Sequence, residues 1–392
     1  MSFDKIIDRR NTGASKWEVK ENELPMWVAD MDFEVAPAIQ KAIIDRAKHP
    51  IYGYTEPYPS WTDAYINFYK DIHNLEIKRE WLLFSAGVVP TISSSVRKLT
   101  EIGDYVVVTP PVYNIFYNSI VNNSRIPYEV PLLENNDSYS IDFVGLEKAF
   151  SDPKTKLFIL CNPANPISKI WSKEDLSKIG ELAKKYNVIV LSDEIHGEIT
   201  RPGKQYIPFL SVNNTNKEVG FAAISVTKSF NVAGIQTSAI IIPNEKIRAL
   251  VNRQINTDEV AEGNVFSYIV AEAALNDSRD WLKEMREYVF ANRDYAEEYI
   301  SKNIPSMKFA KGDATYLIWL DIRNISTSSK ELATFIRNET GLYISSGDVY
   351  GQTGNGFLRM NLACPRVILK DGLTRLKSGI ELYLKRRQFI VQ

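Results

Sequence analysis

The stretch that decides the fold is Ser225-Val226-Thr227-Lys228-Ser229-Phe230-Asn231-Val232-Ala233-Gly234. It continues an apolar run, residues 219–226, which has the composition and length of a buried strand. Lys228 follows directly after this strand, where open α/β sheets bind their ligands. A lysine there can form a Schiff base with an aldehyde cofactor or bind a phosphate. For any one of the 47 lysine and arginine residues, however, a solvated surface position is the simpler explanation.

Length and composition limit the alternatives. A chain of 392 residues predicts two domains, or one large domain with an appendage. The net charge of −1 argues against a nucleic-acid or anionic-membrane surface as partner, and no apolar run approaches the roughly 20 residues of a membrane span. Two cysteines and three histidines, none in ligand spacing, predict neither a disulfide framework nor a structural zinc site, so we expect a cytoplasmic protein.

Residues 157–196 read as a β-α-β unit. A strand at 157–161 ends in Asn162-Pro163-Ala164-Asn165-Pro166, a rigid polar turn. A capping box at Ser172 and Asp175 begins a helix that reaches about residue 187. The next strand ends at Ser192-Asp193-Glu194-Ile195-His196. A right-handed crossover places both strand ends at one edge of a parallel sheet.

Two further strands end in polar or small residues. The strand at 82–85 runs into a turn at Gly87 and a helix, which predicts either an anion site at the helix N-terminus or simple turn chemistry. The strand at 105–109 is followed by Tyr113. If all five strands share one parallel sheet, their ends meet in one crevice. That crevice would hold Gly87, Tyr113, Asn165, Asp193 and Lys228.

This set of groups matches the needs of pyridoxal 5′-phosphate. A carboxylate keeps the pyridine nitrogen protonated, an amide bonds to the phenolic oxygen, an aromatic ring stacks on the cofactor, and a lysine forms the imine. The backbone amides at Gly87 would receive the phosphate.

The remaining segments predict an arm and a second domain. Asp30 and Asp32 lie two residues apart in residues 25–33, which form either an acidic loop or an arm that touches the site. After a long helix at 281–303, two strands flank a helix at 330–339 and indicate a smaller α+β domain. We therefore predict a large α/β domain over residues 45–280, and a small domain over residues 1–44 and 281–392.

Several of these segments together resemble a known family. The segments 162–166, 192–196 and 225–231 look like the signature of class I/II aminotransferases of fold type I. Within that family the chain is most similar to the MalY/PatB-type C–S β-lyases, which include cystathionine β-lyase and cysteine-S-conjugate β-lyase. The segments that fit this branch are Pro25 to Phe33, Gly53-Tyr54, Ser85-Ala86-Gly87-Val88-Val89-Pro90, Pro111-Val112-Tyr113, Phe357 to Asn361 and Cys364-Pro365-Arg366.

The resemblance implies a role for each site residue. Lys228 would be the Schiff-base lysine and the base that moves protons. Asp193 would pair with the pyridine nitrogen, Asn165 with the ring oxygen, and Tyr113 would stack on the ring. The phosphate would be held by the amides of Ala86, Gly87 and Val88, by the hydroxyls of Ser225 and Thr227, and by Tyr54 of the neighbouring subunit in a homodimer with shared sites.

The substrate side is implied in the same way. Arg359 would bind the substrate carboxylate as a bidentate fork, where the plain alternative is a surface salt bridge. Ala29 and Asp30 of the arm would also contact the substrate.

Three positions depart from the common family pattern. His196, expected to bind the cofactor, stands where many aminotransferases have a tyrosine. Ser168 replaces the usual glycine after the second Asn-Pro pair, which predicts a different backbone because serine tolerates positive φ poorly. Gln236 stands where many relatives have a phosphate-binding arginine, so the phosphate charge would be neutralised less completely.

The function implied by the resemblance is α,β-elimination from a cysteine thioether, which releases pyruvate, ammonia and a thiol. An aminotransferase on the same scaffold is the first alternative, since both reactions begin with loss of the Cα proton. His196 and the arm favour the lyase. A regulatory protein that binds a transcription factor is the second alternative, against which an intact set of Lys228, Asp193 and Asn165 argues.

Overall fold

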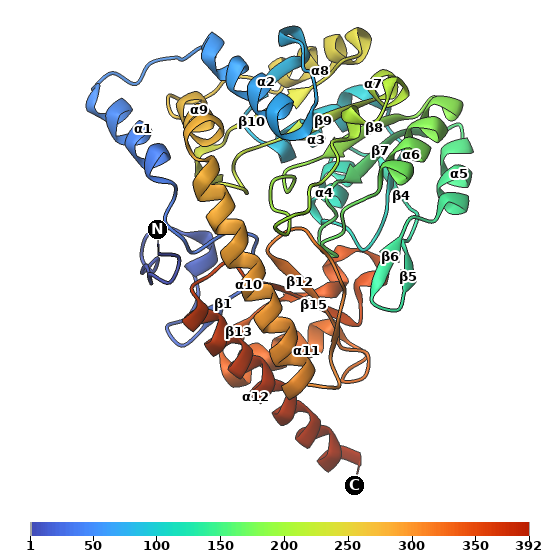
Figure 1. The fold of residues 1–392 in the computed structure, drawn as a ribbon. Helices are drawn as coiled ribbons and strands as arrows, with labels where there is room; N and C mark the ends of the chain where they lie inside the picture. Colours follow the sequence, from blue (N-terminus) through green and yellow to red (C-terminus); the bar gives the residue numbers. More distant parts are fainter. Residues whose placement is uncertain (1, 392) are drawn as a thin grey trace.

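The computed structural model describes residues 2–391 and the side chains of residues 2–388. A seven-stranded sheet lies in the upper half of the molecule in Figure 1. The strand order is β2-β10-β9-β8-β7-β3-β4. Strands β9, β8, β7, β3 and β4 are parallel, while β10 is antiparallel to both β9 and β2, so β2 runs with the other five. The predicted mostly parallel α/β sheet is therefore confirmed. The strands are β2 (Leu82–Ser85), β3 (Tyr105–Val108), β4 (Ile126–Glu129), β7 (Thr155–Cys161), β8 (Ile189–Asp193), β9 (Gly220–Ile224) and β10 (Ser238–Ile241).

Helices cover both faces of this sheet. In β7, Leu157, Ile159 and Cys161 belong to the core with α3, α4 and α8, whereas Phe158 and Leu160 belong to the core on the other face. A strand buried on both faces needs apolar residues at every position, which explains the unbroken apolar runs of the sequence. The helices on the first face are α3 (Val88–Leu99), α4 (Ile115–Val121) and α8 (Glu245–Thr257); those on the second are α2 (Pro59–His73), α5 (Phe143–Ser151), α6 (Lys173–Tyr186) and α9 (Ser267–Asp277).

The β7-α6-β8 unit has the predicted form. The Ser172 hydroxyl accepts from the Asp175 amide, and the Asp175 carboxylate accepts from the Ser172 amide, so the capping box is present. Asn187 ends the helix with a left-handed φ of 55°. Cys161 pairs with Asp193 in the parallel register, so the two strands end side by side.

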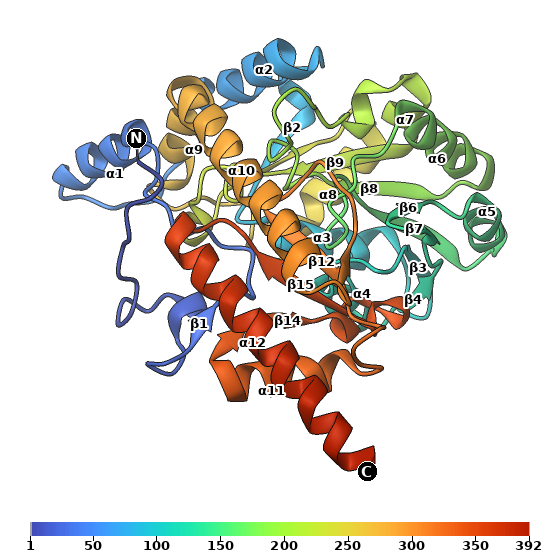
Figure 2. The same cartoon turned by 60° about the horizontal axis from the view of Figure 1, so that its bottom comes forward.

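A second unit is built around a four-stranded sheet, β11-β12-β15-β14. The long helix α10 (Arg279–Asn303) runs from beside α9 down to this sheet (Figure 1), and α11 (Ser329–Thr340) and α12 (Arg366–Val391) lie side by side on it (Figure 2). Near the N-terminus, β1 (Leu24–Pro25) pairs with β13 (Leu342–Tyr343). The remaining strands of the unit are β11 (Lys308–Phe309), β12 (Leu317–Asp321), β14 (Ser345–Ser346) and β15 (Phe357–Asn361).

The unit around the four-stranded sheet has its own apolar core. Leu24 and Met26 contribute to it together with residues 296–383. The predicted boundaries of the two domains stay a prediction. The other α-helices and strands are α1 (Pro37–Lys48), α7 (Asn214–Val219), β5 (Leu133–Asn135) and β6 (Ser138–Ser140). Within residues 2–391, every helix is too short or too polar to span a membrane.

Candidate active site

One cavity of ≈ 280 Å³ lies at the carboxyl ends of the parallel strands. The structure brings most of the predicted site residues into its wall, although they come from segments far apart in the chain. These residues are Ala29, Ala86, Gly87, Val88, Tyr113, Asn165, Asp193, His196, Thr227, Lys228 and Arg359. Ser225, Asp30 and Tyr54 do not line it.

Lys228 lies four residues beyond the end of β9 at Ile224. Its Nζ donates a hydrogen bond to the Ala29 carbonyl oxygen at 2.5 Å. Burial lowers the pKa of this amine, and Arg359 lowers it further, while Asp30 and Asp193 oppose the change. A lowered pKa increases the fraction of neutral amine at neutral pH, which is the form that acts as nucleophile and base.

Asp193 is the last residue of β8, and its carboxylate faces the cavity. Its Oδ1 accepts from the Ile195 amide at 3.1 Å. Burial raises the pKa of this carboxyl to about 7, against the opposing effects of that hydrogen bond and of Lys228. A cationic ring nitrogen in the cavity would supply the opposite charge that a buried carboxylate needs.

Arg359 projects from β15 into the same cavity and is buried. Its Nη1 donates to the Asn165 side-chain oxygen at 3.1 Å, and its Nη2 donates to the Trp27 carbonyl at 2.8 Å. The guanidinium carbon lies 4.9 Å from the Tyr350 ring centre, and Nε has no partner in the described part of the chain. Because Arg359 is buried and its hydrogen bonds go to Asn165 and Trp27, the alternative of a surface salt bridge is wrong.

His196 and Tyr113 also line the cavity. Burial, together with Lys228 and Arg359, lowers the pKa of His196 to about 3, so its imidazole is neutral. Its Nδ1 is buried, and no described residue bonds to it. Burial raises the pKa of Tyr113 to about 12, so its phenol keeps the proton.

The N-terminus of α3 forms the other end of the cavity. Helix α3 begins at Val88 directly after Gly87, and the first amides of a helix have no partner within it. The Ala86 amide is different, because it donates to the Val260 carbonyl at 2.8 Å. An anion at this end would therefore meet the amides of Gly87 and Val88.

Hydroxyl groups lie beside this helix end. The Ser225 hydroxyl donates to the Thr237 carbonyl at 2.7 Å and lies 2.7 Å from the Thr227 hydroxyl. Ser225 therefore supports Thr227, which lines the cavity itself. Gln236 also lines the cavity, so the position of the missing arginine carries a neutral amide there.

The two carboxylates of the arm are structural. Asp30 accepts from Arg9 Nη2 at 2.6 Å, and Asp32 accepts from Lys16 Nζ at 2.6 Å and from Trp17 Nε1 at 2.8 Å. These ion pairs join the arm to the N-terminal segment that precedes it. The arm is bonded to the cavity through its backbone, because the Ala29 carbonyl accepts from Lys228 and the Trp27 carbonyl accepts from Arg359.

The turn after the second Asn-Pro pair differs from the expectation. Ser168 does adopt a positive φ of 58°, so the predicted change of backbone is not needed. Its hydroxyl lies 2.8 Å from the Thr315 hydroxyl and donates to the Leu317 carbonyl at 2.8 Å. These buried hydrogen bonds offset the cost of a left-handed serine.

Some wall residues were not predicted, among them Cys161, Ile195 and Ala233. Cys161 is the last residue of β7, so the strand-end rule that found Asp193 could have found it. Burial raises the pKa of its thiol, and its sulfur accepts from the Asn165 amide at 3.4 Å. The thiol therefore fixes the turn that carries Asn165.

The donor set of the cavity fits pyridoxal 5′-phosphate and an amino-acid substrate. Its wall carries an arginine, a lysine amine, one carboxyl group and a helix N-terminus. Arg359 Nε and His196 Nδ1 are buried without a described partner, so both are free to bond a ligand. A phosphate would accept from the free amides at the helix end, a carboxylate would accept from Arg359, and Asp193 matches a cationic ring nitrogen.

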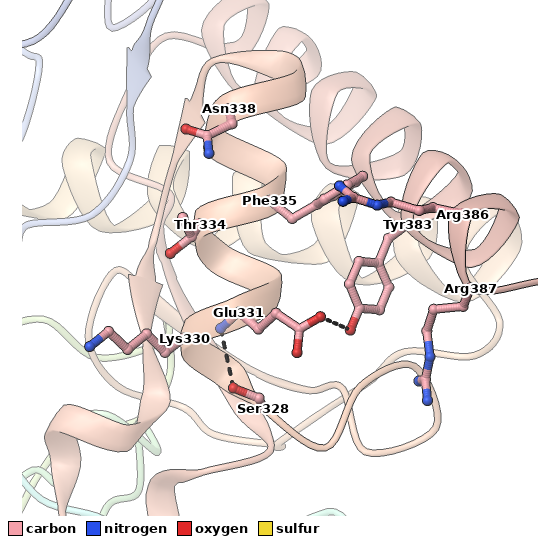
Figure 3. A pocket seen from close by; sticks show the side chains of 9 residues that line it. All are labelled: Ser328, Lys330, Glu331, Thr334, Phe335, Asn338, Tyr383, Arg386 and Arg387. Carbon is pink, nitrogen blue, oxygen red and sulfur yellow. Dashed lines mark hydrogen bonds between the residues drawn. The ribbon is translucent and has the colours of Figure 1, made fainter. Parts of the chain in front are cut away.

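A second hollow, of ≈ 550 Å³, lies between α11 and α12 (Figure 3). Tyr383 donates to Glu331 Oε1 at 2.9 Å, and the Ser328 hydroxyl caps α11 by accepting from the Glu331 amide. None of the predicted site residues lines this hollow. The candidate site is therefore the cavity at the strand ends.

Comparison with known proteins agrees with this geometry. The model of the family "Aminotransferase class I and II" matches residues 22–376. The chain therefore belongs to the class I and II aminotransferase family.

Within the family it falls in the MalY/PatB branch that its sequence resembles. It is 40% identical over 387 residues to cystathionine beta-lyase PatB of Bacillus subtilis (strain 168), which covers 97% of this chain and 100% of PatB. The crystal structure of cystalysin from Treponema denticola, which contains a pyridoxal 5′-phosphate cofactor, matches with a TM-score of 0.94 and 30% identity over 97% of this chain and 98% of that one. A PLP-bound putative aminotransferase from Clostridium difficile 630 matches with a TM-score of 0.93 and 36% identity over 96% and 99% of the two chains.

Proposed function

We propose that the protein is a pyridoxal 5′-phosphate-dependent carbon–sulfur lyase that cleaves cysteine thioethers to pyruvate, ammonia and a thiol. The observation that carries this proposal is the cavity in which Lys228, Asp193 and Arg359 meet. The relatives named as lyases support the proposed reaction. The pyridoxal 5′-phosphate in the cystalysin structure supports the choice of cofactor.

Six of the wall residues would hold the cofactor. Asp193 would keep the ring nitrogen protonated, Asn165 would bond the ring oxygen, and Tyr113 would lie against the ring. The amides of Gly87 and Val88 and the Thr227 hydroxyl would bind the phosphate. When bound, the cofactor supplies an aldehyde that condenses with amines and a ring that accepts the electron pair left at Cα.

The chain's own residues carry out the remaining steps. Arg359 binds the substrate carboxylate and thereby fixes the orientation of Cα. The neutral Lys228 amine takes the Cα proton. A double bond then forms between Cα and Cβ while the Cβ–S bond breaks, and its electron pair leaves with sulfur. Protonation of sulfur gives the thiol, and water converts the three-carbon product to pyruvate and ammonia.

The assembly that fits this site is a homodimer with shared sites. Tyr54 is fully exposed and lies outside the cavity of its own chain, on a loop whose Ile51 and Tyr52 are also exposed. Exposed apolar residues grouped on one loop are typical of an interface. Tyr54 would then reach the phosphate in the partner subunit. We place the enzyme in the cytoplasm, since Cys161 and Cys364 are buried free thiols.

The test is product analysis with purified enzyme. L-cystathionine and L-cysteine are each incubated without a keto acid, and pyruvate and thiol or sulfide are measured. We expect equal amounts of pyruvate and thiol, and no turnover by Lys228→Ala. Turnover that depends strictly on an added keto acid would reject the lyase.

An aminotransferase remains the second candidate, because the Clostridium difficile match is named a putative aminotransferase. Both reactions use Lys228, Asp193 and Arg359 up to the loss of the Cα proton. Formation of a new amino acid from the added keto acid would favour it.

A further inference from the structure

A buried carboxylate that has no part in the chemistry above lies directly behind Asp193. Glu194 is the next residue, and it is almost completely buried. Successive side chains of a strand point to opposite faces, so Asp193 faces the cavity and Glu194 faces away from it. Glu194 does not line the cavity.

Four donors from three segments converge on this carboxylate. Its Oε1 accepts from the Phe209 amide at 2.8 Å, from the Ser192 hydroxyl at 2.9 Å and from the Asn162 side-chain amide at 3.4 Å. Its Oε2 accepts from the Tyr206 hydroxyl at 3.3 Å. A buried carboxylate with its lone pairs satisfied in this way forms a rigid network.

The donors tie together the two strand ends that carry cofactor-facing groups. Asn162 is the residue after β7, and the turn it begins carries Asn165. Its backbone amide donates to the Asp193 carbonyl at 2.9 Å, and its side chain donates to the Ile207 carbonyl at 2.8 Å. Glu194 thus joins the end of β7, the end of β8 and the loop at residues 206–209.

The segment that follows Glu194 is fixed at its other end as well. Glu198 Oε1 accepts from His73 Nε2 at 2.8 Å, and the His73 ring packs edge-on against the Tyr206 ring, with 4.7 Å between the ring centres. The Gly197 position has no room for a side chain, because a Cβ there would lie 2.6 Å from the Tyr206 ring. The residues between Asp193 and Glu198 therefore have little freedom to move.

We propose that Glu194 is a positioning residue that holds Asp193 and Asn165 in register for the cofactor from behind the sheet. The inference rests on the proposed function for the identity of the ligand, but the positioning itself is a property of the chain. Burial raises the pKa of Glu194 to about 7, and its donors and His73 oppose that change. The buried carboxylate of Glu194 therefore carries a desolvation cost, which apolar side chains in its place would avoid.

Two substitutions separate positioning from stability. Glu194→Ala removes the acceptor for all four donors. Glu194→Gln keeps one oxygen for the Phe209 amide, and the Tyr206 hydroxyl can turn to accept from the new amide. The matched control is Glu297→Gln, which removes a partly buried carboxylate bonded to Arg293 at 2.9 Å in the other unit.

Three quantities are measured on each purified protein: the thermal midpoint, the dissociation constant and absorption maximum of bound pyridoxal 5′-phosphate, and deuterium uptake by residues 161–167 and 193–197. Glu194→Ala should weaken cofactor binding at least about tenfold, shift the absorption maximum and increase uptake in both segments, since about one charged hydrogen bond of cofactor contact is lost. In Glu194→Gln, the cofactor dissociation constant, the absorption maximum and the deuterium uptake should lie close to those of the unchanged protein. Glu297→Gln should lower only the thermal midpoint.

The outcomes distinguish this inference from the proposed function. If Glu194→Ala loses thermal stability but keeps the cofactor constants and the deuterium uptake of the unchanged protein, Glu194 is only structural and the inference fails. If the unchanged protein binds no cofactor, the proposed function fails. In that case the deuterium uptake still decides whether Glu194 positions the two strand ends.

Discussion

Replacement of Arg359 by lysine tests how the substrate carboxylate is bound. The guanidinium uses one Nη hydrogen for Asn165 and one for the Trp27 carbonyl, so Nε–H and one hydrogen on each Nη remain for a substrate. These remaining donors match the two oxygens of a carboxylate. A lysine keeps the charge, but its single nitrogen cannot serve Asn165, Trp27 and two carboxylate oxygens together.

The expected loss is one charge-assisted hydrogen bond to the substrate. Such a bond is worth about 1.5–3 kcal/mol, which corresponds to a decrease in kcat/KM of roughly 10- to 150-fold. Because the carboxylate is not altered in the reaction, the ground state and the transition state lose the same contact, and most of the effect should appear in KM. The assay is steady-state release of pyruvate from L-cystathionine.

The control is Arg323→Lys, which changes an exposed arginine paired with Glu134 and Asp321. Such a surface pair contributes little, so kcat/KM should stay within about twofold. A kcat/KM for Arg359→Lys within threefold of the unchanged enzyme would show that Arg359 does not bind the carboxylate. A large decrease confined to kcat would show that Arg359 acts on the chemistry instead.

Three other outcomes follow from the site. In the cofactor-free protein the pKa of Asp193 is raised from 3.8 to about 7, so the folded state holds a proton that the unfolded state has lost. The free energy of unfolding should therefore fall as pH rises from about 4 to about 7, and Asp193→Asn should flatten the slope of urea midpoints against pH. Mixing inactive Lys228→Ala with Tyr54→Ala should restore about a quarter of the activity if subunits exchange, because one site of each mixed dimer is intact; no recovery after verified exchange would contradict shared sites. Ser168→Ala should lower the free energy of unfolding by about 1–3 kcal/mol in urea titrations through the loss of two buried hydrogen bonds, whereas an unchanged midpoint would show that those bonds contribute nothing.

The residues at the strand ends were predictable because their position follows from the geometry of a parallel sheet. Apolar runs located β7, β8 and β9, and the rule that ligands bind at the carboxyl ends of strands selected Asn165, Asp193 and Lys228. This rule can be applied from local sequence alone, because parallel strands all have their carboxyl ends at the same edge of the sheet. For the same reason it also applies to β2, although the antiparallel β10 lies between β2 and the rest.

Other contacts could not be derived from local sequence. Arg359 comes from a different sheet, and only the family resemblance assigned it to the site. The role of Ala29 depends on its carbonyl, which accepts from Lys228, and the arm is further bonded to distant residues, with Arg359 donating to the Trp27 carbonyl and Asn361 to the Asp30 carbonyl. Long-range pairs of this kind depend on tertiary packing and carry no periodic signal.

The motif at residues 192–196 contains Glu194 as well as Asp193, which lines the cavity. In Ser192-Asp193-Glu194-Ile195-His196, strand alternation separates Asp193 on the cavity face from Ser192 and Glu194 on the opposite face. The motif therefore places two buried carboxylates in sequence, one that lines the cavity and one that accepts from four donors of the protein. The backbone at the end of β8 is held by two hydrogen bonds, from the Asn162 amide to the Asp193 carbonyl and from the Glu194 amide to the Ala223 carbonyl. The network of Glu194 adds side-chain bonds to these. A second carboxylate on the other face thus adds to the constraint on this strand end without entering the cavity.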